Sequence, residues 1–197
     1  MTRPYVYYSA LVAFVAATAM TIASIAIPNW ISYSSTSVDG ETYSKHIGLH
    51  KTCSDLNDPP CRVFPTEDQC QGDERYFCGV WRTMGFLASF ATVIYLAGIV
   101  SFVVVMAGGK FKREVGWKVL SPLLLLAALV EFVIMGVVVY IYNNDDQFTV
   151  PGWGLDTSWF LCTVSASIAV LCSVGLLLSA YLLPPEDDYE FLQDPVS

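Results

Sequence analysis

The sequence predicts an all-α membrane fold, a bundle of four transmembrane helices with a small disulfide-braced extracellular β-sheet in its first outer loop. Three observations predict this fold. The 197-residue chain is 54% apolar and only 14% charged, whereas soluble domains carry about a quarter charged residues. The apolar excess lies in four stretches, and four cysteines lie between the first two of them. The stretches are 10–27, 83–108, 119–142 and 159–183.

Each apolar stretch is close to or above the roughly 20 residues that a helix needs to cross a hydrocarbon core of about 30 Å. None shows the alternation of a barrel strand, so helices are the means by which their backbone groups are satisfied in lipid. The predicted segments are an N-terminus 1–8, a first span 9–29, an outer loop 30–82, a second span 83–108, an inner loop 109–118, a third span 119–142, an outer loop 143–158, a fourth span 159–183 and an acidic tail 184–197.

Basic residues in short loops set the predicted orientation. The connection between the second and third spans carries Lys110, Lys112, Arg113 and Lys118, so we expect it in the cytoplasm together with both termini. The chain is then a multi-pass protein of the plasma membrane with two loops outside the cell. The alternative is that the first stretch is a cleaved signal peptide, although its apolar run is longer than is usual for one.

Four cysteines of the long outer loop, Cys53, Cys61, Cys70 and Cys78, indicate two disulfides on the oxidising side of the membrane. Three pairings are open. We prefer the sequential pairs, Cys53 with Cys61 and Cys70 with Cys78, because each closes a short loop that contains turn-forming residues. A zinc site is the alternative, but the usual spacing of about two to four residues within cysteine pairs is missing.

Runs of β-forming residues in the same loop predict short strands. They are 30–36, 43–53 and 62–64. The last run ends at Pro65, which suits an edge strand because proline cannot donate to a sheet. The two remaining cysteines, Cys162 and Cys172, lie in the fourth span, and we expect them to pack as apolar thiols.

A tryptophan just after the first span, a Gly-Leu pair and two cysteines that flank a short turn form one motif. Its residues are Trp30, Gly48, Leu49, Cys53 and Cys61, with Arg82 at the entrance to the second span. In order, spacing and topology the chain resembles the claudin, peripheral myelin protein and epithelial membrane protein superfamily, as a distant member similar to fungal or invertebrate four-transmembrane cortical proteins. His50 stands where that superfamily prefers tryptophan. The resemblance implies an extracellular sheet that acts in cell adhesion at a cell junction.

One ionisable residue, Glu131, lies near the middle of the third span, where charges are costly and often functional. Two interpretations stay open: an ion or proton site, or a carboxyl that hydrogen-bonds a hydroxyl on another helix. The candidate hydroxyls are those of Tyr95, Ser101 and Ser167. In the tail, Tyr189 and Leu192 fit a tyrosine-based sorting signal.

Charge and motif content argue against several function classes. With 10 basic and 18 acidic residues the net charge is −8, so we expect no nucleic-acid partner. The sequence has no HExxH, phosphate loop, nucleophile elbow or Cys-x-x-Cys, so we expect no enzyme, no cofactor and no metal site.

The leading hypothesis is a claudin-like organiser of the plasma membrane or of cell contacts, which acts through its outer sheet and lateral helix packing. Its partners would be membrane lipids and other copies of itself or another integral membrane protein. The alternative is an auxiliary subunit that modulates a channel, a transporter or a membrane signalling receptor. A third hypothesis is cation passage along the acidic outer loop, past Asp39 and Glu41.

Overall fold

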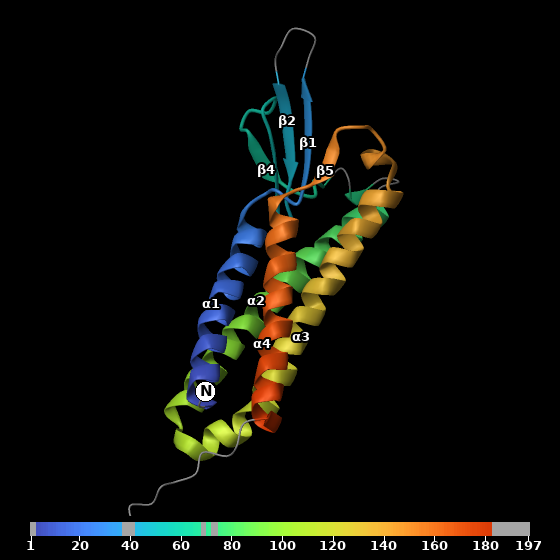
Figure 1. The fold of residues 1–197 in the computed structure, drawn as a ribbon. Coiled ribbons are helices and arrows are strands. Elements are labelled where there is room, and N and C mark those ends of the chain that lie inside the picture. The colour runs from blue at the N-terminus through green and yellow to red at the C-terminus, as the bar shows by residue number, and fades with distance from the viewer. Residues whose placement is uncertain (1–2, 37–41, 68–69, 72–74, 183–197) are drawn as a thin grey trace, which may run out of the picture.

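The computed structural model describes residues 3–36, 42–67, 70–71 and 75–182. Four long helices form a bundle, and a small antiparallel sheet stands on one end of it (Figure 1). The helices are α1 (Arg3–Ala26), α2 (Arg75–Ala107), α3 (Gly109–Asn144) and α4 (Thr157–Leu182). We call the end that carries the sheet the sheet-side end, and the end with the α2–α3 connection the opposite end.

All four helices are long and apolar enough to cross a membrane, by length and composition. Their bounds differ from the sequence prediction in three places. Helix α1 begins at Arg3 rather than at residue 9. Helix α2 begins at Arg75 rather than at residue 83, so about two turns extend beyond the predicted span. The segment 109–118, predicted as a loop, is the start of α3, because its lysine, arginine and glutamate residues are good helix formers.

The sheet has five antiparallel strands in the order β4-β3-β2-β1-β5. They are β1 (Ile31–Thr36), β2 (Thr42–Ile47), β3 (Lys51–Ser54), β4 (Cys61–Val63) and β5 (Trp153–Leu155). The predicted run 43–53 is thus two strands. A turn at Gly48 separates them, where the backbone passes so close to Pro28 that an added Cβ would lie 2.5 Å from the Pro28 Cα.

Strand β5 comes from the connection between α3 and α4, which the sequence predicts only as a loop. It pairs with β1 through the register Ile31 with Leu155 and Tyr33 with Trp153. Three residues are too few to show an alternating pattern, so the strand exists only because the fold brings this connection beside β1. Both connections at the sheet-side end therefore build one sheet.

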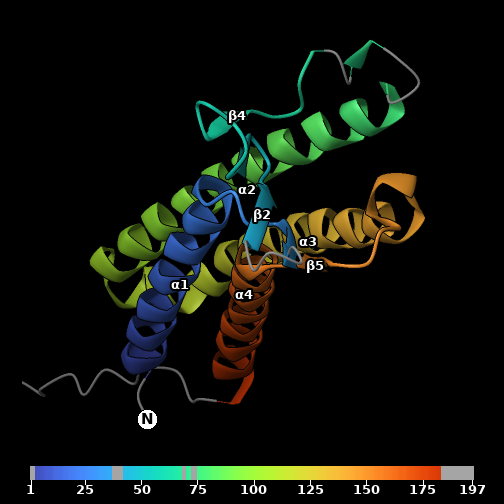
Figure 2. The ribbon, with the colours of Figure 1, turned by 90° about the horizontal axis from the view of Figure 1, so that it is seen from above.

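Burial in strand β1 follows distance from the bundle. In β1, Ile31 is buried, while Ser34, Ser35 and Thr36 are exposed. The reason is that β1 stands on end above the helices, so only its lowest residue is covered (Figure 1). Seen from above, the sheet-side ends of α2 and α3 extend to one side, away from α1 and α4 (Figure 2).

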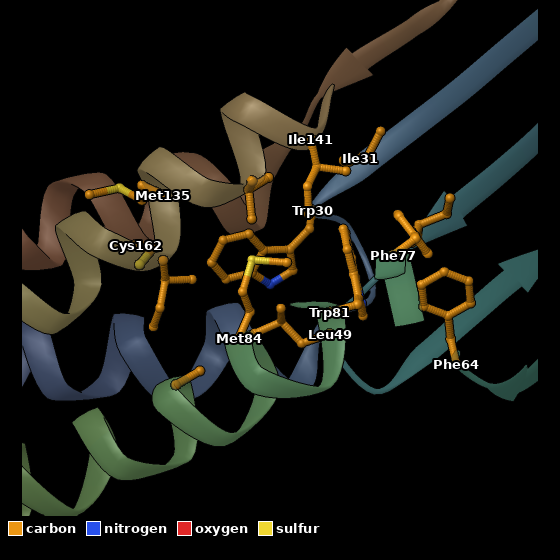
Figure 3. Packing of buried hydrophobic residues seen from close by; sticks show 14 of the residues in the cluster. Trp30, Ile31, Leu49, Phe64, Phe77, Trp81, Met84, Met135, Ile141 and Cys162 are labelled. Carbon is orange, nitrogen blue, oxygen red and sulfur yellow. The ribbon is translucent and has the colours of Figure 1, made fainter. Parts of the chain in front are cut away.

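A cluster of buried apolar residues joins the sheet to the bundle. At its centre Trp30 is fully buried, with Met84 of α2, Leu49 and Cys162 of α4 also in the cluster (Figure 3). The Trp30 indole donates to the Ser24 carbonyl at 2.7 Å, which satisfies one of the carbonyls that the end of α1 leaves unpaired. We call this group the Trp30 cluster.

A second apolar cluster fills the bundle toward the opposite end, and helices alone build it. Its buried aromatic members are Tyr7, Phe14, Tyr95 and Phe102, with Phe14 stacked on Tyr95 at a centroid distance of 4.9 Å. Gly98 makes room for this stack, because an added Cβ there would lie 2.6 Å from the Phe14 ring. We call this group the Phe14 cluster.

Candidate functional site: the braced sheet and the buried polar cluster

Two disulfides brace the sheet-side end. They join Cys53 to Cys61 and Cys70 to Cys78, which are the sequential pairs preferred from the sequence. Cys53 and Cys61 are also direct partners in the β3–β4 register, so this bond links two adjacent strands. The Cys70–Cys78 bond instead fastens the loop to the first turn of α2. The two remaining cysteines, Cys162 and Cys172, are buried free thiols.

The strand register sorts the side chains of the sheet onto two unlike faces. Residues directly opposite one another share a face, and so do residues two apart on one strand. Tyr33 faces Lys45 on β2 and Trp153 on β5, and Tyr43 lies two residues from Lys45. We call this side, made of Tyr33, Tyr43, Lys45 and Trp153, the aromatic face.

Ring contacts hold the aromatic face together. Tyr33 lies 5.1 Å from Trp153 and 6.1 Å from Tyr43 between ring centroids, and the Lys45 ammonium lies 5.8 Å from the centre of the Trp153 ring. All four side chains are half-buried. Trp153 also contacts Phe148 of the 3-10 helix η2 (Asp146–Phe148), at 5.3 Å. Tyrosine and tryptophan are among the side chains that are enriched in recognition surfaces.

The other face is polar. It carries Ser32, Ser44 and His46. The Ser44 hydroxyl and backbone N–H donate to Asp55 at 2.5 Å and 3.0 Å, and these bonds hold the pKa of Asp55 below its ordinary value. This face therefore keeps a carboxylate charge at neutral pH beside the β2–β3 hairpin.

Asp156 ties this polar face to the start of α4. Partial burial opposes its ionisation, but hydrogen bonds from the Thr157 backbone at 2.6 Å, the Thr157 hydroxyl at 2.9 Å and Ser32 prevail, so the pKa of Asp156 is lowered. The His46 Nδ1 lies 3.6 Å from its other oxygen, an ion pair whenever the imidazole is protonated. The Asp156 backbone N–H also donates to the Trp30 carbonyl.

The residues of the sequence motif lie at the junction of sheet and bundle. Trp30, Gly48 and Leu49 are buried there, and the Trp81 indole donates to the Gly48 carbonyl at 3.1 Å. Trp81 is fully buried and was not among the motif residues, although its position one residue before Arg82 was visible in the sequence. Arg82 itself is exposed, and it makes no hydrogen bond or ion pair within the described ranges.

A buried polar cluster lies between the two apolar clusters, and each helix contributes one residue to it: Thr21, Tyr95, Glu131 and Ser165. The Glu131 carboxyl, 1% exposed, accepts from the Thr21 hydroxyl at 2.6 Å and from the Tyr95 hydroxyl at 2.8 Å, one on each oxygen. The Ser165 hydroxyl lies 2.7 Å from that of Thr21 and 3.0 Å from that of Tyr95. We call these four residues the Glu131 cluster.

Both carboxyl oxygens of Glu131 have a hydroxyl donor within this cluster. Thr21 and Tyr95 supply the two carboxyl oxygens, and Ser165 donates to the Ala17 carbonyl at 2.9 Å. Among the described residues no lysine, arginine or histidine forms an ion pair with Glu131, and no group of metal ligands is found. The geometry is that of hydrogen bonding between helices, which was one of the two interpretations of Glu131.

The predicted partners of Glu131 were right in one case and wrong in two. Tyr95 does bind it, whereas the hydroxyls of Ser101 and Ser167 donate to carbonyls of their own helices, Ala97 and Thr163. Thr21 and Ser165 were missed. A signal was present, because both are hydroxyl residues near the middle of apolar stretches, but helix rotation decides which hydroxyls face inward.

Two predicted features lie outside the part of the chain that the structure describes. They are the sorting signal at Tyr189 and Leu192 and the acidic residues Asp39 and Glu41.

Comparison with known proteins adds no relative, since neither a family model nor a curated protein sequence matches the chain.

Proposed function

We propose that this protein is a multi-pass membrane protein that organises cell contacts or the plasma membrane by recognising other proteins through its sheet. It acts without a chemical step. Its first partner is another copy of the chain or another integral membrane protein, as in the claudin-like proteins that its motif resembles. The aromatic face is the surface that we assign to this recognition.

The observation that carries this proposal is that both sheet-side connections form one braced platform. Strands β1 to β4 and the distant β5 pair in a single sheet, the Cys53–Cys61 bond links two of its strands, and Trp30 fixes its base in the bundle. A platform that is rigid before binding loses little conformational entropy on binding. The partly exposed rings of Tyr33, Tyr43 and Trp153 then supply contact area.

The distribution of cysteines and bases supports placing the sheet outside the cell. Both disulfides lie at the sheet-side end, as expected in an oxidising compartment. The bases of the α2–α3 connection lie at the opposite end, as expected for the cytoplasmic side. Cysteine introduced at Ser34 should react with a membrane-impermeant maleimide on intact cells, whereas cysteine introduced at Lys112 should react only after permeabilisation.

The first experiment removes the brace of the sheet. Replacing Cys53 and Cys61 together by serine opens a loop of sequence separation 8, which should lower the free energy of unfolding by about 2.5 kcal/mol. We expect surface delivery or self-assembly to be lost. The matched control replaces Cys70 and Cys78 by serine, which opens a loop of the same separation but leaves the strands linked. A Cys53/Cys61 variant that reaches the surface and assembles normally would contradict the proposal.

The second experiment tests the aromatic face itself. Tyr43→Ala removes a ring from this face, whereas Ser34→Ala changes an exposed residue of the opposite face. Pull-down with a differently tagged copy in mild detergent should weaken for Tyr43→Ala and stay unchanged for Ser34→Ala. Recovery of one stoichiometric channel, transporter or receptor in place of a second copy would favour the alternative function of an auxiliary subunit.

A further inference from the structure

Two adjoining cavities lie along the seam between α1 and α2 at the sheet-side end. The first has a volume of about 310 Å³, and its walls include Ile22, Ile25 and Ala26 of α1 and Ser89 and Thr92 of α2. The second has a volume of about 240 Å³ and lies at the base of the sheet. Ile25 and Ala26 border both cavities, so the two are neighbours along the last turn of α1. We call the pair the α1–α2 crevice.

The first cavity is apolar in character although two hydroxyl residues border it. The Ser89 hydroxyl donates to the Gly85 carbonyl at 3.0 Å, and the Thr92 hydroxyl donates to the Ala88 carbonyl at 3.1 Å. Both protons are thus used within α2. What remains in the wall is mainly hydrocarbon, which matches an acyl chain, and neither hydroxyl has a proton left to donate to a polar ligand.

The second cavity ends in basic side chains. His50 and Lys51 border it, and both are exposed. The His50 ring packs on α2, since an added Cβ at Gly85 would lie 2.9 Å from His50 Cε1. No acidic side chain is among the described residues that border either cavity. The crevice therefore pairs a hydrocarbon wall with a positively charged mouth.

We propose that the α1–α2 crevice binds one glycerophospholipid, with an acyl chain along Ile22 and Ala26 and its phosphate at Lys51 and His50. The basic side chains at the mouth complement the negative charge of a phosphate, and the apolar wall below them complements an acyl chain. The inference rests on the membrane placement given under the proposed function. The lipid belongs to the leaflet on the sheet side, because the mouth lies at the base of the sheet.

Native mass spectrometry of the full chain tests this inference. The protein is reconstituted in nanodiscs that contain dioleoyl phosphatidylcholine and dioleoylglycerol, which differ in the phosphate head, and is then released in mild detergent. We expect one phosphatidylcholine per chain to be retained in preference to dioleoylglycerol. Lys51→Glu should lower the retained fraction about tenfold, the factor that the loss of one charge-assisted hydrogen bond produces. Arg62→Glu is the matched control, since Arg62 is an exposed base of the neighbouring strand that does not border the crevice.

A second pair of variants tests the hydrocarbon wall. Ala26→Phe fills the point where the two cavities adjoin and should lower retention of both lipids. Ala16→Phe makes the same change at an exposed position of α1 that lies about 15 Å along the helix from Ala26 and borders neither cavity, and it should change nothing. Circular dichroism and the two disulfides establish that each variant is folded.

Two results would overturn the inference. One is retention of dioleoylglycerol as strong as that of phosphatidylcholine; the other is retention that neither Lys51→Glu nor Ala26→Phe reduces. A folded, correctly inserted chain that retains no phospholipid would refute this inference and leave the proposed function standing. A chain whose impermeant-maleimide labelling contradicts the membrane placement would refute both.

Discussion

At the sheet-side end the space between the helices is filled by residues of the connections, whereas toward the opposite end it is filled by the helices alone. Trp30, Leu49 and Phe148 come from connections and lie in the Trp30 cluster with residues of three helices. The Phe14 cluster draws its buried members from α1 to α4, among them many alanines. Small residues let helices approach closely, so that end needs no further element to fill it.

This contrast explains how a small sheet is held on a helix bundle. The sheet has few buried residues of its own: β1 and β2 each bury one residue, and β4 is exposed throughout. Its position therefore depends on two indole hydrogen bonds that cross the junction: Trp30 donates to the Ser24 carbonyl of α1, and Trp81 of α2 donates to the Gly48 carbonyl between β2 and β3. The Glu131 cluster separates the two packing schemes and ties all four helices together.

The largest expected effect is loss of the Trp30 side chain. Trp30→Ala should lower the free energy of unfolding by about 3–5 kcal/mol and release the sheet, because the indole packs between sheet and bundle. Phe14→Ala should cost a similar amount without releasing the sheet. Thermal unfolding measures the loss of stability, and limited proteolysis of the β1–β4 region measures release of the sheet. If the sheet is equally protected from proteolysis in both variants, the Trp30 cluster does not hold the sheet on the bundle.

Glycine substitutions test the two ends at positions where the backbone lies too close to a neighbour for an added Cβ. Gly48→Ala forces a Cβ against the Pro28 backbone and should cost about 1–3 kcal/mol, whereas at Gly98 the contact is with the Phe14 ring, which can shift, so Gly98→Ala should cost less. Gly136→Ala is the control, because an added Cβ there meets nothing within 4 Å. Thermal unfolding in one detergent measures the order. A Gly48→Ala variant as stable as Gly136→Ala would contradict the account of the β2–β3 turn.

Substitutions at Glu131 test whether the Glu131 cluster, which lies between the two apolar clusters, holds the helices together. Glu131→Ala leaves the Thr21 and Tyr95 hydroxyls without their acceptor and should cost about 1–3 kcal/mol. Glu131→Gln keeps an oxygen acceptor and the side-chain volume, so it should cost less. Hydrogen exchange of the four helices should rise near Thr21 and Ser165 in the alanine variant. An unchanged melting temperature for Glu131→Ala would show that the cluster does not hold the helices together.

The smallest expected effect is a pH dependence at the junction of sheet and bundle. A lowered folded-state pKa means that Asp156 contributes stability above its ordinary value of 3.8 and loses it as pH falls through the folded-state value. The melting temperature of the wild type should therefore fall more below about pH 4 than that of Asp156→Asn. If the melting temperatures of the two proteins fall equally with pH, Asp156 does not contribute to stability at this junction.

The four helices follow from the sequence alone, because each is a long apolar stretch that lacks the alternation of a strand and is long enough to cross a membrane. The sequence also determined the position of the braced loop, since cysteines and β-forming runs are local features. It predicted the strands at 30–36 and 62–64 within a residue of their observed bounds.

Strand β5, the hydrogen-bond partners of Glu131 and the rotation of each helix became known only from the tertiary structure. Strand β5 and the partners of Glu131 come from segments more than 30 residues away from what they contact, and no local pattern records such a pairing. The rotation of each helix selected Thr21 and Ser165 over Ser101 and Ser167. Packing between distant segments decides this, because the sequence does not distinguish a hydroxyl that will face a neighbouring helix from one that will face outward.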